Sequence, residues 1–584
     1  MTTDQPAPAV VAAVPPARAG AAQPGGAPAG DAPPAAPAAG RRGFLAKAFG
    51  VTALLSAAGS ALGLLRDLLL ARYFGANQGT DAFLVAWTVP ETAAPLLIED
   101  AMSFLMVPAF SLALVLREER PAGPDPVRQL VRATLPWLLL ALCALSLAVA
   151  LGAPQLVAVL APGLADPGLA VSCTRITAFT VLPFGVAGYL GSALRAHHRF
   201  TAPAAIYVAY NLGILAVLLT GQAFLGVRSA AVGVAFGSLL MAGVLVGPFL
   251  RRLRGGRRRR RRRGTAGHGG LVLIPLAILP VAAFTLTRQA QVFIERFLGS
   301  GLPPGTISHL NYAAKVSQLA MTAGILIVTV TFPLVARALA AGDLAAARDR
   351  VEKDLGQAAA VVLMGTAFLM ACAPSVVALL FQRGAFGAPD TAATAAVIRV
   401  YSFGLPAQAM IGVMVRPFFS LRPVVRRADG PKADDGGRRL LDWYPVAAMA
   451  LGLLVTVAVG LAATPGFGAL GLAAGNAAGI TTTAALLLRG LLLRGIALRL
   501  PRVLAGQARL LAAAVAAAAA GTLAATLSGD PLLSTVTGGA AVVLVYAAVG
   551  TALGAAEVRG PVRALARALY PPATAAEGKL PHGR

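Results

Sequence analysis

Apolar runs about as long as a membrane is thick recur along this chain and constrain its fold more than any other feature. A membrane-spanning helix needs about 20 mostly apolar residues. Charged residues make up 13% of the 584 positions and hydrophobic residues 57%, whereas roughly a quarter of a soluble chain is charged. We predict an all-α polytopic membrane protein with about 14 transmembrane helices, at residues 46–73, 82–113, 131–152, 168–194, 202–223, 229–250, 271–297, 305–336, 355–381, 390–419, 442–463, 467–493, 505–527 and 533–556.

Basic residues are unevenly divided between the connections of these helices, and this division predicts the topology. Lys and Arg accumulate in the cytoplasmic loops of membrane proteins. With a cytoplasmic N-terminus, strongly basic connections such as "LREERPAGPDPVRQLVR", "RRLRGGRRRRRRRG" and "RPVVRRADGPKADDGGRR" all fall on the cytoplasmic side. The opposite connections carry only Arg228 and Arg383. An even number of helices with both termini in the cytoplasm is therefore expected.

Composition divides the chain into six segments. Residues 1–44 are rich in Pro, Ala and Gly and are expected to form a disordered cytoplasmic tail. The arginines of Arg257–Arg263 lie near the middle of the predicted helices, as a linker between two halves would. We expect an N-terminal six-helix lobe, a basic linker, a C-terminal six-helix lobe, two further transmembrane helices and a cytoplasmic tail, at residues 45–250, 251–270, 271–500, 501–558 and 559–584.

The net charge of +26 could suggest nucleic acid binding in a soluble protein. In a membrane protein it is better explained by cytoplasmic loops. Anionic headgroups attract basic residues near the membrane surface by about 1 kcal/mol each. We therefore expect the Arg257–Arg263 linker to meet anionic lipid and expect no nucleic acid partner.

Two short segments of the first half are echoed in the second. "TRITAFTVLP", which ends at Pro183, is echoed by "IRVYSFGLP", which ends at Pro406. "VAVLAPG" at Val157 is echoed by "VALLFQRG" at Val377. Parallel repeats build transporters with a central cavity between two lobes. Chance similarity between Leu- and Ala-rich helices is the alternative.

The sequence offers no constellation typical of an enzyme. Cys143, Cys173 and Cys372 lie in separate apolar stretches, and the five histidines are scattered. No G-x-x-x-x-G-K-[ST] phosphate loop is present. We expect neither catalysis nor a cofactor or resident metal.

Charged residues inside the predicted helices are the best functional candidates. Arg66 and Asp67 lie side by side in "GLLRDLLLARYF", although a charge in hydrocarbon costs at least about 2.5–3.5 kcal/mol. Adjacent helical residues point about 100° apart. We therefore expect each to have a partner on another helix and to face a polar cavity or gate. Mutual neutralisation near an interface is the alternative.

Two further helices contribute candidates. Glu99 and Asp100 lie midway along the second predicted helix, and one of them is expected to pair with an Arg of the first helix or a Lys of the eighth. Arg288 and Glu295 are seven positions apart in the seventh helix and so share a face. Of these two, Arg288 is deep enough to reach a cavity.

The stretch "GLLRDLLLARYFGANQGTDAFLVAW" resembles the first-helix signature of the MurJ/MviN family, the lipid II flippases of the multidrug/oligosaccharidyl-lipid/polysaccharide (MOP) exporter superfamily. Further stretches resemble the family in the same order between residues 45 and 500. They are "IEDAMSFLMVPAFS", "LGSALRAHHRFTAPA", "FLGSGLPPGTISHLNYAAKVSQL", "VALLFQRGAFGAPDT" and "YSFGLPA".

The resemblance implies two pseudo-symmetric six-helix lobes in a V plus two C-terminal helices. It implies that the chain moves an undecaprenyl-diphosphate-linked peptidoglycan precursor of the lipid II type across the bacterial cytoplasmic (inner) membrane by alternating access, in cell wall biogenesis. Because guanidinium grips phosphate through paired donors, we expect the headgroup to meet Arg66, Lys315 and Arg288. The acidic residues expected to serve a gate or ion coupling are Asp67, Asp81 and Glu99.

The chain departs from the family pattern at several cationic positions. Ser60 stands where the first helix of the family has a second Arg. "PETAAPLL" places Ala94 and Pro95 where an Arg pair follows a Pro-Asn. "NYAAK" places Ala314 and Lys315 where the family has Asp-Arg. Either the cargo differs from lipid II, or other groups such as Arg288 replace the missing arginines.

Two other functions remain open. One is a transport-inactive membrane scaffold that binds cell-wall synthesis proteins, which the missing arginines would suit. The other is a MATE-like exporter of a different cargo. That exporter would need acidic or aromatic groups in its cavity, but aromatic residues are only 6% of the chain.

Overall fold

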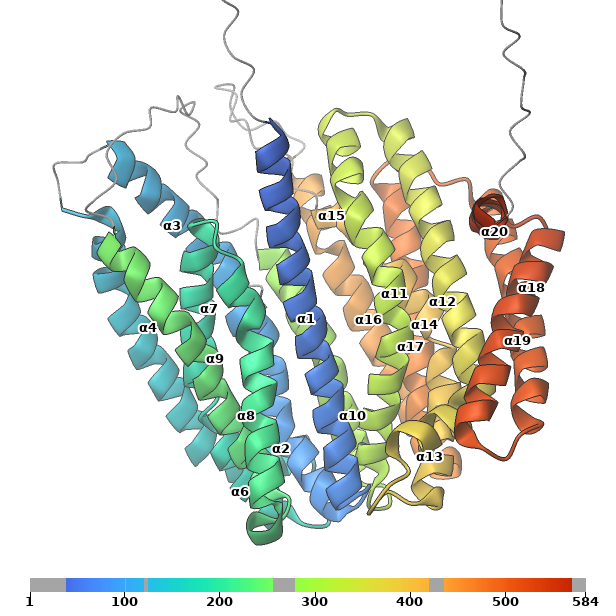
Figure 1. The fold of residues 1–584 in the computed structure, drawn as a ribbon, viewed down its shortest axis with the longest axis horizontal. Helices are drawn as coiled ribbons and strands as arrows, with labels where there is room; N and C mark the ends of the chain where they lie inside the picture. Colours follow the sequence, from blue (N-terminus) through green and yellow to red (C-terminus); the bar gives the residue numbers. More distant parts are fainter. Residues whose placement is uncertain (1–37, 100, 120–123, 256–278, 420–434, 570–584) are drawn as a thin grey trace, which may run out of the picture. The chain divides into compact units, whose positions relative to one another are not determined.

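The computed structural model describes residues 38–99, 101–119, 124–255, 279–419 and 435–569. Every regular element within these ranges is a helix (Figure 1), which confirms the all-α class. The Arg257–Arg263 linker and Asp100 lie outside these ranges. The helices before the linker are α1 (Ala38–Phe74), α2 (Gln78–Ala94), η1 (Pro95–Glu99), α3 (Ala101–Glu119), α4 (Pro126–Leu151), α5 (Ala153–Leu160), α6 (Pro167–Ala178), α7 (Val181–Ala196), α8 (Thr201–Leu225) and α9 (Arg228–Gly255).

The helices after the linker begin with α10, at the position of the seventh predicted helix. They are α10 (Leu279–Ser300), α11 (Thr306–Ala340), α12 (Leu344–Phe381), α13 (Ala388–Ser402), α14 (Leu405–Met414), α15 (Arg416–Phe419), α16 (Asp435–Phe467), α17 (Ala469–Leu493), α18 (Leu500–Thr526), α19 (Pro531–Ala552) and α20 (Ala556–Leu569). Figure 1 shows α18 and α19 side by side at one edge of the helical array, where two additional helices are predicted.

Eleven helices among the described residues are long and apolar enough to cross a membrane. The number rises to twelve if the pair 388–402 and 405–419, bent by 44°, counts as one span. The predicted number of about fourteen is therefore not confirmed, although a multi-pass membrane protein is. α10 is not among the eleven, and it carries Arg288, Glu295 and Arg296 within 22 residues. Such charges in a helix of this length point toward a polar interior.

The second predicted helix, 82–113, is interrupted in the structure. α2 ends at Ala94, a π-helical turn spans Pro95–Glu99, and α3 begins at Ala101. Pro95 has no N–H to donate to the preceding turn, and a π-helical turn widens the helix locally. α7 packs closely on this turn, since a Cβ at Gly188 would lie 1.8 Å from the Leu97 carbonyl oxygen.

The two echoed segments both fold as interrupted helices. α6 ends at Ala178 and α7 begins at Val181, while α13 ends at Ser402 and α14 begins at Leu405. In each pair an arginine, Arg175 or Arg399, lies in the last turn before the break. The matching breaks favour an internal repeat over chance similarity.

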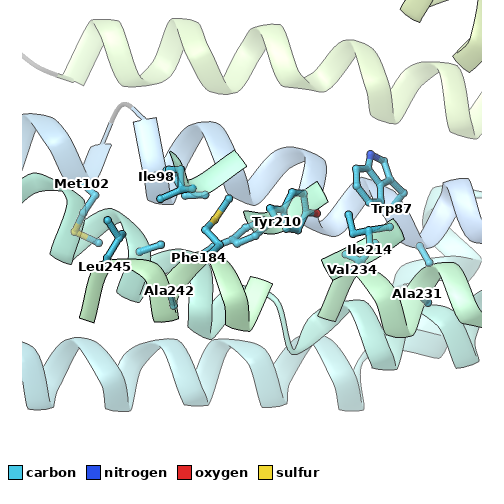
Figure 2. Packing of buried hydrophobic residues seen from close by; sticks show 14 of the residues in the cluster. Trp87, Ile98, Met102, Phe184, Tyr210, Ile214, Ala231, Val234, Ala242 and Leu245 are labelled. Carbon is cyan, nitrogen blue, oxygen red and sulfur yellow. The ribbon is translucent and has the colours of Figure 1, made fainter. Parts of the chain in front are cut away.

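Buried apolar residues form three clusters. The chain divides into two units, Met1–Phe49 and Gly50–Arg584. All three clusters lie in the second unit. One cluster unites α2 to α9, which we call the N-terminal group (Figure 2 shows Phe184 and Tyr210 together within it). The other two unite helices between α10 and α19, which we call the C-terminal group. The predicted lobe boundaries themselves stay a prediction.

α1 belongs to both groups. Leu70 packs in the N-terminal cluster and its neighbour Ala71 packs in a C-terminal one. Residues adjacent on a helix point in different directions, so α1 lies between the two groups at this point. Charged residues placed one turn before Leu70 therefore lie where both groups meet.

Candidate functional site between the two helix groups

Arg66 is held by three different kinds of contact. Its Nη2 lies 2.7 Å from Asp67 Oδ1. Its Nη1 donates to Asn211 Oδ1 of α8 at 3.5 Å, and its guanidinium carbon lies 4.5 Å from the centre of the Trp87 ring of α2. A cation over an indole face is stabilised by about 0.5–2 kcal/mol. Arg66 is thus oriented by the N-terminal group.

The direct Arg66–Asp67 pair corrects one expectation. The angle between adjacent helical positions predicts separate partners, but the Arg66 side chain is long enough to turn its Nε and Nη2 onto the same Asp67 oxygen, at 2.9 and 2.7 Å. Asp67 is 5% exposed. A buried carboxylate beside a guanidinium is far less costly than an isolated one, so the pair explains how α1 carries both charges.

Glu91 is a carboxylate that the sequence reasoning missed. It extends from α2 toward the C-terminal group, where its Oε1 lies 3.9 Å from Lys315 Nζ of α11 and its Oε2 lies 3.9 Å from Arg296 Nη2 of α10. Its backbone carbonyl accepts a hydrogen bond from Gln289 Nε2 at 3.1 Å. The same rule that singled out Arg66, a charge within a predicted apolar helix, could have found it.

A small cavity connects these groups. Its walls come from α1, α2, α8, α9 and α11 and include Arg66, Asp67, Trp87, Asn311 and Lys315. The space open to water-sized groups is about 10 Å³, which is about what one water needs. In this conformation two of the predicted cations, Arg66 and Lys315, line a narrow site that has to widen before a headgroup could enter.

Asp81 joins the two groups at the end that is expected, from the distribution of basic residues, to face outward. Its Oδ2 accepts a hydrogen bond from Gly305 N at 2.6 Å, and its Oδ1 accepts from Ser308 N at 2.8 Å and Ser308 Oγ at 2.6 Å. These donors belong to the first turn of α11 and the residue before it, so Asp81 caps the start of α11 from another helix. We call these contacts the Asp81 latch.

Backbone contacts between α1 and its neighbours reinforce this closure. Arg72 O accepts from Ala385 N at 2.8 Å. Gly384 has φ +66°, and a Cβ there would lie 2.2 Å from the same carbonyl oxygen. Gly163 N donates to Ser300 Oγ at 3.2 Å. A cavity of about 210 Å³ beside the latch is lined by Asp81, Gly163 and Ser300 among others.

The remaining predicted site residues lie apart from the cavity lining. Glu99 is exposed at the end of η1 and accepts a hydrogen bond from Tyr207 of α8. The expectation that either Glu99 or Asp100 pairs with an Arg or a Lys stays a prediction, because Asp100 lies outside the described residues. Lys315 lies near Glu91. Arg288 is exposed on α10, and so is Ser60 on α1. Arg288 therefore does not replace the missing arginines in this conformation.

Glu295 anchors a separate polar cluster inside the C-terminal group. Its Oε1 accepts hydrogen bonds from Tyr401 Oη and Asn476 Nδ2, both at 2.7 Å, and from Gln291 Nε2 at 3.1 Å. All three partners are neutral side chains. Among the described residues no group of three or more His, Cys, Asp or Glu side chains could hold a metal ion.

Comparison with known proteins gives consistent results. The family model "Lipid II flippase MurJ" matches residues 70–426. A probable lipid II flippase MurJ of Rhizobium meliloti (strain 1021) is 28% identical over 367 residues, covering 61% of this chain and 67% of the relative. The lipid II flippase MurJ of Burkholderia cenocepacia is 27% identical over 401 residues, covering 64% and 73%.

Solved structures share the fold. "Lipid II flippase MurJ, inward closed conformation" superposes with a TM-score of 0.65 at 16% identity, covering 88% of this chain and 99% of that one. An inward-facing multidrug resistance MATE transporter of the MOP superfamily gives a TM-score of 0.60 at 12% identity, covering 75% and 95%.

Proposed function

This chain belongs to the lipid II flippase MurJ family, and from that premise we propose that it moves an undecaprenyl-diphosphate-linked peptidoglycan precursor across the bacterial cytoplasmic membrane. Members of this family are transporters and not enzymes. The observation that carries the proposal is the narrow cavity between the helix groups, where Arg66 from α1 and Lys315 from α11 lie in a mostly apolar wall. Two cations from different helices can grip one diphosphate.

Alternating access follows from the same arrangement. The Asp81 latch and the Arg72–Ala385 contact close one end between the groups. Cargo can enter from the opposite side only if the central cavity widens there. It can leave only if these contacts break. Asp81 is accordingly a gate residue, and Asp67 orients Arg66; coupling to an ion through Asp67 or Glu99 remains a separate expectation.

A cargo other than lipid II is the second candidate. Ser60, Ala94 and Pro95 lack the cationic side chains of the family pattern, and Lys315 is a point charge in place of a planar fork. Fewer directional donors favour broader tolerance toward headgroups. A transport-inactive scaffold for cell-wall synthesis proteins would need no diphosphate site at all.

Binding by the purified protein separates these functions. Undecaprenyl diphosphate, lipid II and an uncharged polyprenol would be compared by a direct binding assay in detergent. We expect both diphosphates to bind more tightly than the polyprenol. Tight binding of undecaprenyl diphosphate without preference for lipid II favours a different cargo. Equal affinity for all three would contradict the flippase proposal and favour the scaffold.

The orientation in the membrane has its own test. We propose that both termini and the Arg257–Arg263 linker are cytoplasmic and that the linker meets anionic lipid headgroups. Single cysteines at Gly301 and Ala388, placed in a chain without its native cysteines, should react with an impermeant reagent from outside. A cysteine at Thr265 should not, and its labelling from outside would reverse the proposed topology.

A further inference from the structure

Glu91 supplies charge to its two basic partners but no close hydrogen bond. Both of its ion pairs measure 3.9 Å, between Oε1 and Lys315 Nζ and between Oε2 and Arg296 Nη2. Hydrogen bonds between such groups usually measure 2.7–2.9 Å. Although Oε2 is buried, it has no hydrogen-bond partner. The carboxylate is thus near both cations without satisfying either.

Arg296 shows the same deficit from the other side. The residue is 3% exposed, and its Nε is buried without a hydrogen-bond partner. Leaving a buried guanidinium without an anion is costly, and the carboxylate within 4 Å of it among the described residues is that of Glu91. Arg296 therefore has free donor capacity in the closed conformation.

We propose that Glu91 is an internal counter-anion, which holds the place of a lipid-linked diphosphate beside Lys315 and Arg296 and is displaced by it. This inference rests on the proposed function. A diphosphate offers several charged acceptor oxygens and is not fixed to the α2 backbone. It can therefore approach both cations to hydrogen-bond distance. Glu91 reaches only to 3.9 Å.

The displacement has a consequence for specificity. An uncharged ligand cannot replace the counter-anion, because Lys315 and Arg296 would both be left without one. A neutral polyprenol therefore leaves Glu91 in place and its affinity does not depend on this carboxylate, whereas Glu91 competes with weakly charged headgroups. The displacement adds Arg296 to the cations that meet the cargo, which offsets part of the loss at Ser60, Ala94 and Pro95.

The displacement also changes how the two groups are joined. Glu91 lies on α2 in the N-terminal group, while Lys315 and Arg296 lie on α11 and α10 in the C-terminal group. When a diphosphate takes its place, one direct charge link between the groups is lost. The hydrogen bond that the Gln289 side-chain Nε2 donates to the Glu91 backbone carbonyl does not depend on the carboxylate and can persist.

Glu91→Gln tests the proposal in the full-length protein. Removing the competing charge should tighten binding of undecaprenyl diphosphate about tenfold. Affinity for undecaprenol should stay within about twofold. In a Lys315→Ala background this gain in affinity should fall to less than about half of its size. Glu91 and Lys315 interact directly, so the effects of the two substitutions are not additive. Glu295→Gln is the matched control, since it removes a carboxylate one residue from Arg296 that is held by neutral donors.

Each outcome discriminates. If the unchanged protein binds undecaprenyl diphosphate but Glu91→Gln leaves that affinity the same or weakens it, the counter-anion proposal is overturned while the proposed function stands. If the unchanged protein shows no preference for the diphosphate, the proposed function itself fails. Should Glu91→Gln not fold, Glu91→Asp retains the charge but withdraws it, and we expect about two- to threefold tighter binding; unchanged or weaker binding would again overturn the proposal.

Discussion

Asp81 and Glu91 lie on the same helix and both reach the C-terminal group, yet they are held in opposite ways. Asp81 accepts three hydrogen bonds of 2.6–2.8 Å, two of them from backbone N–H groups. Glu91 has two ion pairs of 3.9 Å and an unpartnered oxygen. A carboxylate satisfied by backbone donors fixes a geometry. A carboxylate that stays 3.9 Å from two side-chain cations can be exchanged for another anion. The comparison thus distinguishes the Asp81 contacts, which close the site, from the Glu91 contacts, which an incoming anion would replace.

Loss of Arg66 should have the largest effect on transport and none on closure. Arg66→Ala is expected to abolish transport, because the cavity loses the cation that Asp67, Asn211 and Trp87 orient. Transport would be measured in proteoliposomes, with membrane insertion checked separately. Arg72→Ala removes an exposed arginine from the same helix and serves as the control. Full activity of Arg66→Ala would show that the central site does not depend on this charge.

Removal of the Asp81 carboxylate should open the outer end. Asp81→Ala leaves Gly305 N and Ser308 N unsatisfied, at a cost of about 3 kcal/mol for hydrogen bonds to a charged group. A cysteine replacing Leu70, which is buried and lines the central cavity, in a chain without native cysteines, reports through an impermeant reagent when that cavity opens to the outer end. Labelling should accelerate by roughly 100-fold. Unchanged labelling would mean that the latch does not control access.

Lys315 should affect binding more than closure. Lys315→Ala is expected to weaken diphosphate binding by about 1.5–3 kcal/mol, the scale of a hydrogen bond to a charged group. Lys315→Arg should be tolerated, since it keeps the charge and adds paired donors. Titration of both variants with undecaprenyl diphosphate measures this. If labelling at Leu70→Cys also accelerates in the Lys315→Ala chain, Lys315 contributes to closure as well as to binding, and this prediction is wrong.

Ser308→Ala should produce the smallest change. It removes the hydroxyl donor to Asp81 while both backbone donors remain. We expect a loss of about 1.5 kcal/mol and labelling at Leu70→Cys accelerated by roughly tenfold. Ser300→Ala removes an uncharged acceptor, that of Gly163 N, at the same end and should accelerate labelling less than Ser308→Ala, because hydrogen bonds between neutral groups contribute less. An effect of Ser308→Ala equal to that of Asp81→Ala would mean that the hydroxyl, and not the backbone donors, carries the latch.

The sequence was sufficient for the helical class because hydropathy reports burial in lipid directly. It was not sufficient for the break at Pro95, since the surrounding residues remain apolar on either side of it. Nor could the angle between adjacent positions exclude the Arg66–Asp67 pair, because that angle ignores how far a long side chain can turn. Glu91 was not predicted as a site residue, because its segment was compared with the family pattern only for arginines. The Asp81 latch joins residues more than two hundred positions apart, and no local pattern records such a pairing.

Leu70 and Ala71 pack in different clusters, and this determines which helix group α1 and its Arg66 follow when the groups separate during release. Separation of the helix groups has to break the packing of one of these neighbours. Burying a leucine stabilises by about 1.5–3 kcal/mol and an alanine by less, so α1 stays with Leu70. Arg66 then travels with Asn211 and Trp87, away from Lys315 and Arg296. If a diphosphate is held from both sides, as we propose, opening the exit moves the two halves of its binding site apart and by itself lowers the affinity for the cargo.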